Sequence, residues 1–119
     1  MKTKTTKKPV TKMDNKTFFR LQEKLFDDCV SISKAKGEEY TIGSGQKFDN
    51  FERTAAILGL DRSDVVHTFL IKHLQSILYY KKYGKEASDE SIRGRYIDAI
   101  NYLVLDYGMI WEDTFLNND

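Results

Sequence analysis

Residues 89–105, with the sequence DESIRGRYIDAINYLVL, form a strongly apolar helical pattern that carries a single polar stripe. At about 100° per residue, Glu90, Asp98 and Asn101 lie on one side of this helix and apolar residues cover the other side. A carboxylate among apolar neighbours needs a cation, a metal ion or hydrogen-bond donors as partners. We therefore expect this helix at the centre of an all-α fold, with its polar stripe against a partner or a ligand.

Three further segments show helical periodicity, and no segment shows sustained strand-type alternation. Polar residues that can cap helices precede these segments, and glycines follow them. The expected helices cover about residues 15–37, 48–58, 61–84 and 88–111, with Asp14 or Asn15, Asp61 and Ser88 as N-terminal caps and Gly37, Gly59 and Gly84 as ends. Short connections between four helices predict a compact all-α four-helix bundle, and the glycine-bearing residues 37–47 form its longest internal loop.

A chain of 119 residues supports one domain, which we expect over residues 15–117. Residues 1–14 are expected to form a disordered, lysine-rich arm. Residues 1–16 hold six lysines and one aspartate, a balance of +5, which leaves −4 for the remainder of a chain whose net charge is +1. Such an arm can contact nucleic acid or an acidic partner, or it can serve only as a solubilising tail. The mildly acidic body argues against specific binding of duplex DNA.

The sequence has one cysteine, Cys29, on an apolar helical face, so a reducing compartment fits it best. No apolar run approaches the length of a membrane span, and a soluble cytoplasmic protein without a membrane partner is expected. The C-terminal helix is apolar almost all round. Such a helix is either central or shared with another subunit, and we expect a homo-oligomer formed through it.

The third predicted helix carries a candidate phosphate site. Lys72 and Ser76 lie one helical turn apart and flank the apolar arc between Phe69 and Ile77, into which His73 points. The ammonium, hydroxyl and imidazole groups could together hold a phosphate. The alternative is a core histidine paired with Asp98 or a backbone carbonyl, with Lys72 extending into solvent.

Acidic residues around the glycine-bearing loop suggest a magnesium site. Mg²⁺ prefers oxygen ligands and usually takes one or two carboxylates from the protein. Glu39, Glu52 and Asp98 could hold this ion against a nucleotide, although exposed acidic residues near helix ends are also common. Tyr40 lies in polar, glycine-rich surroundings and could stack on a base.

Four segments carry a resemblance to a known family: KGEEY at 36–40, FDNFERTA at 48–55, KHLQSI at 72–77 and ESIRGRYIDAINYL at 90–103. This order resembles small, phage-type nucleotide-modification-associated proteins, which are distantly similar to the all-α nucleoside triphosphate pyrophosphohydrolases of the MazG and dimeric dUTPase class. The resemblance covers roughly residues 30–107, and D-x-x-N-Y-L is its most specific part. It implies a MazG-like fold and a nucleotide ligand, in the cytoplasm of a bacterial host if the protein is phage-encoded.

The resemblance also implies a Mg²⁺ cluster to which Asp98 contributes, and here the chain departs from the pattern. Arg95 stands where the pyrophosphohydrolases have the glutamate of E-x-x-D. Gly94 stands where an acidic residue is expected one turn before the aspartate. These departures favour a nucleotide that is bound and not cleaved.

Three functions remain open from the sequence. The first is a nucleotide-binding protein with Mg²⁺-dependent hydrolysis, in which Asp98 and Glu90 are catalytic and Arg95 neutralises transition-state charge. The nucleotide would be bound by Tyr40, Lys72, His73, Ser76, Arg95 and Asn101. The second is a non-catalytic phage protein that sequesters a nucleotide, as an anti-defence protein would, and the third is a structural or interaction protein without a ligand.

Overall fold

The computed structural model describes residues 12–41, 45–86 and 91–116 of the chain. Within these ranges the fold consists of four α-helices and one π-helical turn, which confirms the all-α prediction. The elements are α1 (Asn15–Tyr40), α2 (Asp49–Leu58), α3 (Arg62–Tyr83), α4 (Ile92–Trp111) and η1 (Glu112–Leu116). None of the helices in the described part of the chain combines the length and hydropathy needed to cross a lipid bilayer.

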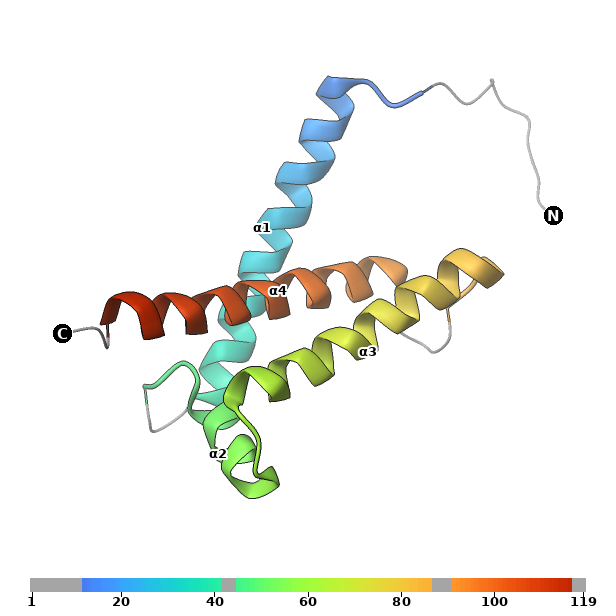
Figure 1. The fold of residues 1–119 in the computed structure, drawn as a ribbon. Coiled ribbons are helices and arrows are strands. Elements are labelled where there is room, and N and C mark those ends of the chain that lie inside the picture. The colour runs from blue at the N-terminus through green and yellow to red at the C-terminus, as the bar shows by residue number, and fades with distance from the viewer. Residues whose placement is uncertain (1–11, 42–44, 87–90, 117–119) are drawn as a thin grey trace.

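Helices α3 and α4 lie side by side, α1 crosses α4, and the short α2 covers the start of α3 (Figure 1). The N-terminal half of α1 projects beyond α3 and α4. The buried apolar core consists of Cys29, Ala55, Val65, Val66, Ile77, Ile97, Ala99 and Met109. Most of these residues lie on α3 and α4, the two helices that share the most extensive contact in the described fold.

Local capping explains most helix boundaries. The Asp14 side chain accepts a hydrogen bond from the backbone N–H of Thr17 at 2.8 Å and begins α1. Asp61 and Asp64 form the predicted capping box of α3. Gly84 ends α3 with φ 72°, a left-handed conformation that a residue with a side chain rarely adopts.

Two predicted boundaries are wrong. Helix α1 continues through Gly37 to Tyr40, because the Thr41 backbone N–H, at 3.0 Å, and its hydroxyl, at 2.6 Å, both donate to the Gly37 carbonyl and close one more turn. Helix α4 is capped by Ser91, whose hydroxyl accepts from the Gly94 N–H at 3.0 Å. The expected cap, Ser88, and the arm over residues 1–11 lie outside the described residues.

Arg62 connects α2, α3 and η1. Its guanidinium donates to Glu52 at 2.8 Å and to Asp113 at 3.0 Å, pairs with Glu112 at 2.6 Å, and lies over the ring of Phe48 at 5.2 Å. Burial alone would lower the pKa of Arg62, but the hydrogen bond to Glu112 and the neighbouring carboxylates raise it above its ordinary value. The arginine therefore stays charged and fixes the start of α3 against the end of α4.

Candidate functional site

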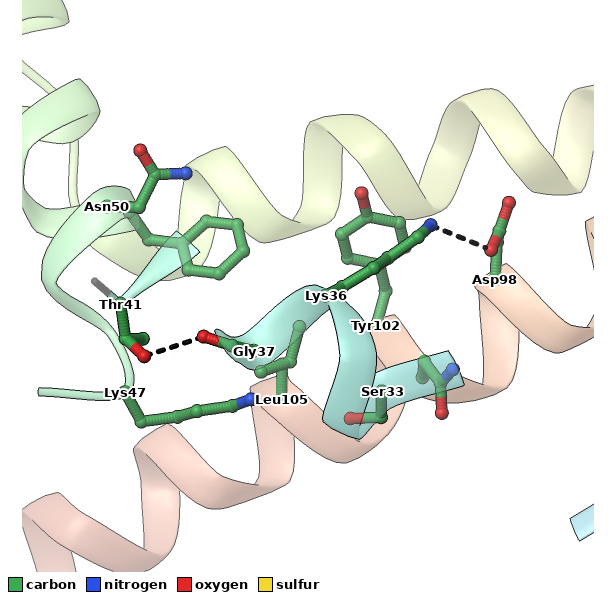
Figure 2. Close-up of a pocket in the computed structure, with 11 residues that line it drawn as sticks. Ser33, Lys36, Gly37, Thr41, Lys47, Asn50, Asp98, Tyr102 and Leu105 are labelled. Atoms are coloured by element: carbon green, nitrogen blue, oxygen red, sulfur yellow. Dashed lines mark hydrogen bonds and ion pairs between the residues drawn. The ribbon is translucent and has the colours of Figure 1, made fainter. Parts of the chain in front are cut away.

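A cleft opens between the C-terminal half of α1, the start of α2 and the middle of α4 (Figure 2). Its inner part encloses about 60 Å³ and continues into an outer part of about 370 Å³, with which it shares Ser33, Gly37, Thr41 and Lys47. The inner part is lined by Ser33, Lys36, Gly37, Thr41, Lys47, Asn50, Phe51, Asp98, Asn101, Tyr102 and Leu105. We refer to both parts together as the cleft.

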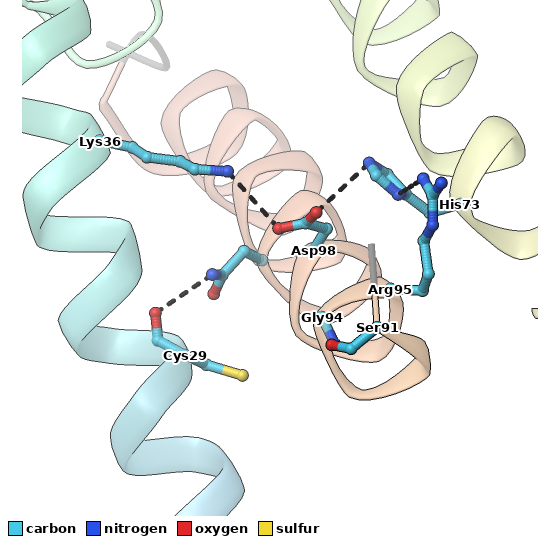
Figure 3. Close-up of polar contacts among 8 residues, drawn as sticks. Cys29, Lys36, His73, Ser91, Gly94, Arg95 and Asp98 are labelled. Atoms are coloured by element: carbon cyan, nitrogen blue, oxygen red, sulfur yellow. Dashed lines mark hydrogen bonds and ion pairs between the residues drawn. The ribbon is translucent and has the colours of Figure 1, made fainter. Parts of the chain in front are cut away.

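Asp98 is the carboxylate of the inner cleft, and it lies between Lys36 and His73 (Figure 3). Its Oδ1 atom accepts from Lys36 Nζ at 3.5 Å, and its Oδ2 atom lies 3.8 Å from His73 Nε2. The Asp98 side chain is 18% exposed, whereas Lys36 is 50% exposed at the cleft mouth. The predicted need of this carboxylate for a cationic partner is therefore met within the chain by Lys36.

Behind Asp98 lies a buried polar pair between α3 and α4. Arg95 and His73 are 7% and 6% exposed, and Arg95 Nη1 lies 3.3 Å from His73 Nδ1. The His73 ring stacks on Tyr102 with 5.6 Å between centroids, and Tyr102 stacks on Phe69 at the same spacing. Tyr102, which lines the cleft, is therefore in direct contact with the buried His73 behind Asp98.

Asn101 fixes α4 against α1. Its Nδ2 atom donates to the Cys29 carbonyl at 3.1 Å. The Cys29 thiol is buried, and burial raises its pKa, so it stays protonated. About two turns earlier on α4, Arg93 donates to Asp28 at 2.6 Å, and this bond lowers the pKa of Asp28. These contacts hold the cleft walls at a defined separation.

Lys47 supplies a second ammonium group to the cleft. A Cβ atom added to Gly37 would lie only 2.9 Å from Lys47 Nζ, so the glycine leaves room for this ammonium against α1. Lys36 and Lys47 thus approach one cleft from two directions. The aromatic residues Phe51 and Tyr102 line the same cleft. Two ammonium groups beside aromatic rings and side-chain amides suit an anionic, planar ligand.

The structure gathers part of the predicted site. Asp98 and Asn101 line the cleft, and His73 and Arg95 lie directly behind Asp98. Both His73 and Arg95 face the α3–α4 interface. They would therefore influence a ligand in the cleft through Asp98 and would not touch it. The expected alternative for His73, a core histidine beside Asp98, agrees with its burial.

Lys72 and Ser76 are not among the residues that line the cleft. Lys72 is exposed on α3, and the Ser76 hydroxyl donates to the Lys72 carbonyl at 3.3 Å. One position on a helix rotates a side chain by about 100°, so burying His73 turns Lys72 toward solvent. The two residues therefore do not join His73 in one phosphate site.

The predicted carboxylates are also separated. Glu39 is exposed on the last turn of α1, and Glu52 on α2 is bound by Arg62. Glu90 and the Tyr40 side chain lie outside what the structure describes. Within the described ranges, no three His, Cys, Asp or Glu side chains are grouped so that they could share one metal ion.

Lys36, Lys47 and Tyr102 are cleft residues that sequence reasoning missed. Lys36 lies seven residues after Cys29, on the same face of α1, and Tyr102 lies four residues after Asp98 on α4. This spacing could have identified both residues. Lys47 follows no helical repeat, and only the folded chain brings it to the cleft.

Comparison with known proteins adds no assignment, because no family model, curated protein or solved structure matches the chain.

Proposed function

We propose that this protein binds a nucleotide in the cleft between α1, α2 and α4. The observation that carries this proposal is the presence of Lys36 and Lys47 in the same cleft as Phe51, Tyr102 and two side-chain amides. The ammonium groups would bind the phosphate, and an aromatic ring would contact the base. The amides of Asn50 and Asn101 supply donors and acceptors for polar groups of the nucleoside.

The inner and outer parts of the cleft differ in size, so they would hold different parts of the ligand. The inner part, at about 60 Å³, has room for a few water molecules or a small ligand group. The outer part, at about 370 Å³, falls within the range of about 300–1,000 Å³ that is usual for small-molecule sites. The bulk of a nucleotide would therefore occupy the outer part, with the edge of its base inserted into the inner part, which Phe51 and Tyr102 line.

We propose binding without Mg²⁺ as the primary activity. The one described carboxylate at the inner cleft, Asp98, has Lys36 against one oxygen and His73 near the other, and Glu52 is committed to Arg62. Such a donor set does not fit the oxygen cage that Mg²⁺ requires. Arg95 lies buried against His73, so a role in neutralising a transition state is not part of this proposal.

The test is to incubate the purified protein with a broad nucleotide pool, with and without Mg²⁺, and to analyse the free and retained fractions by mass spectrometry. Retention of an intact nucleotide in both conditions is the expected result. A Mg²⁺-dependent loss of one nucleotide, with its monophosphate appearing, would instead establish a hydrolase. Retention of no nucleotide would favour a structural or interaction protein.

Matched lysine variants locate the site. Lys36→Ala and Lys47→Ala should each weaken binding about 10- to 100-fold, since a hydrogen bond to a charged group contributes about 1.5–3 kcal/mol. Lys72→Ala removes an equal charge from the exposed face of α3 and should leave the affinity unchanged. Equal weakening by all three variants would indicate nonspecific attraction and contradict the cleft assignment.

We also propose that the protein works in the cytoplasm, that of a bacterial host if it is phage-encoded, and that it self-associates through the C-terminal helix α4. A nucleotide ligand and a single buried thiol both fit a reducing compartment. Analytical ultracentrifugation tests the association directly.

A further inference from the structure

One side of α4 carries a continuous apolar surface that no other part of the described chain covers. The side of α4 that contains Asp98 and Asn101 faces α1, and the side that contains Arg95 and Tyr102 faces α3. The remaining side exposes Tyr96, Leu103, Val104, Tyr107, Ile110 and Trp111, which are between 39% and 64% exposed. We call these six residues the α4 outer face. A contiguous apolar surface formed by several large exposed side chains usually marks an interaction site.

The N-terminal half of α1, residues 15–27, carries a second uncovered apolar surface. Phe18, Phe19, Leu21 and Phe26 are between 45% and 57% exposed. The contacts that tie α1 to α4 involve Asp28, Cys29 and Lys36, which all lie later in α1. A helix of this length without tertiary contacts is marginally stable in water, so packing of this surface would stabilise it.

The two surfaces are complementary in chemistry and in length. At 1.5 Å per residue, the 13 residues of the α1 half span about 20 Å, and the α4 outer face from Tyr96 to Trp111 spans about 22 Å. The α4 outer face holds no charge, whereas the α1 half is amphipathic and keeps Arg20, Glu23 and Lys24 for solvent. An amphipathic helix on an apolar face is a common mode of recognition.

An α1 half that covers the α4 outer face must come from another molecule. Helix α1 is continuous through residue 27 and projects past α4, so its first half cannot fold back onto the α4 of its own chain (Figure 1). A second copy offers the same pair of surfaces, and a two-fold axis lets each copy cover the other. Six of the ten side chains on the two surfaces are aromatic, a class that buries about 150–250 Å² each when covered, and all ten are roughly half exposed here, so one such contact removes on the order of 1,000 Å² from solvent. Two contacts then reach the size of a stable dimer interface.

We propose that the N-terminal half of α1 of one protomer packs on the α4 outer face of a second copy, and that the exchange is reciprocal. This inference rests on the self-association proposed above and names the segment that covers α4. The interface is separate from the cleft, so nucleotide binding and this arrangement can fail independently.

Cysteine cross-linking tests the arrangement. Two double variants, Phe19→Cys/Tyr107→Cys and Phe26→Cys/Leu103→Cys, are treated with a short thiol cross-linker, and the four single variants are treated in parallel. Covalent dimers are expected from at least one double variant and from no single variant. The wild-type chain controls for Cys29, which is only 4% exposed. Covalent dimers from Tyr107→Cys alone would show that α4 pairs with α4 and would overturn the proposal.

A charge substitution gives a second readout that does not depend on cross-link geometry. Phe19→Glu and Tyr107→Glu each place a carboxylate in the proposed interface, and both positions are more than half exposed, at 57% and 64%. Each variant should be monomeric by light scattering at concentrations where the wild type is dimeric, while Lys24→Glu should remain dimeric. A monomeric wild type would overturn both this proposal and the self-association, and a dimer that survives Phe19→Glu would overturn this proposal alone.

Discussion

The Nη1 atom of Arg95 lies 3.3 Å from Nδ1 of His73, between α3 and α4. A guanidinium has only donors, so Nδ1 of His73 accepts this hydrogen bond. In the neutral imidazole the proton is then on Nε2, which faces Asp98 Oδ2 at 3.8 Å. The bond from Arg95 therefore orients the His73 ring so that its Nε2 atom faces the carboxylate at the inner cleft.

Removing the His73 side chain should lower the free energy of unfolding by more than its size suggests. His73→Leu deprives the buried Arg95 of an acceptor, and the expected loss is about 1–3 kcal/mol in the free energy of unfolding. Replacing both partners, as in His73→Leu/Arg95→Met, should restore part of this loss, because the guanidinium that lost its His73 acceptor is then removed as well. Urea denaturation measures both values. A double variant less stable than His73→Leu alone would contradict this account, and the exposed Lys72→Ala serves as the neutral control.

The fork geometry of Arg62 predicts a specific effect of a conservative substitution. Arg62→Lys keeps the charge but cannot reach Glu52, Glu112 and Asp113 together, and the expected loss is about 1–2 kcal/mol of stability. Hydrogen exchange should become faster over residues 109–116, where the chain loses its attachment. Arg53→Lys, at a side chain 67% exposed, should change neither property. Unchanged exchange in Arg62→Lys would show that η1 is held by other contacts.

The bond between Arg93 and Asp28 predicts a pH dependence of stability. The hydrogen bond from Arg93 lowers the pKa of Asp28 in the folded state from the ordinary value of 3.8, so the unfolded chain binds more protons than the folded chain just below that pH. The resulting stabilisation is present above pH 3.8 and is lost as the pH falls through the folded-state pKa. Arg93→Met should therefore be less stable than the wild type at pH 7 and equally stable at a strongly acidic pH. Urea denaturation at a series of pH values tests this, and a difference that persists at the acidic limit would contradict it.

Local patterns predicted the helices well because each depends on residues close in sequence. The capping box of Asp61 and Asp64 and the helix ends at Gly59 and Gly84 follow from backbone chemistry within a few residues. Gly37 misled the prediction, since a glycine can also continue a helix, and hydrogen bonds from Thr41 decide between the two outcomes.

The cleft depends on how the helices cross, and the periodicity of the sequence does not predict a crossing. The stripe of Asp98 and Asn101 correctly indicated the side of α4 that needs partners. Which groups meet that stripe follows from the crossing of α1 over α4, which brings Lys36 to Asp98 across 62 positions of the chain. The packing of α3 on α4 buries His73 and thereby leaves Lys72 exposed, although the spacing of Lys72 to Ser76 suggested a joint site.

Gly37→Ala should separate stability from ligand binding. Alanine stabilises a helix by up to about 1 kcal/mol relative to glycine, and its Cβ would lie 2.9 Å from Lys47 Nζ, the end of a flexible side chain that can move at little cost. The melting temperature should therefore rise, while the affinity for the nucleotide identified in the retention assay should fall about 3- to 10-fold because the ammonium is displaced from the cleft. In a Lys47→Ala background, Gly37→Ala should raise the melting temperature without weakening binding further. If affinity falls equally in both backgrounds, Gly37 itself contacts the ligand, and Lys47 is not the group through which the substitution acts.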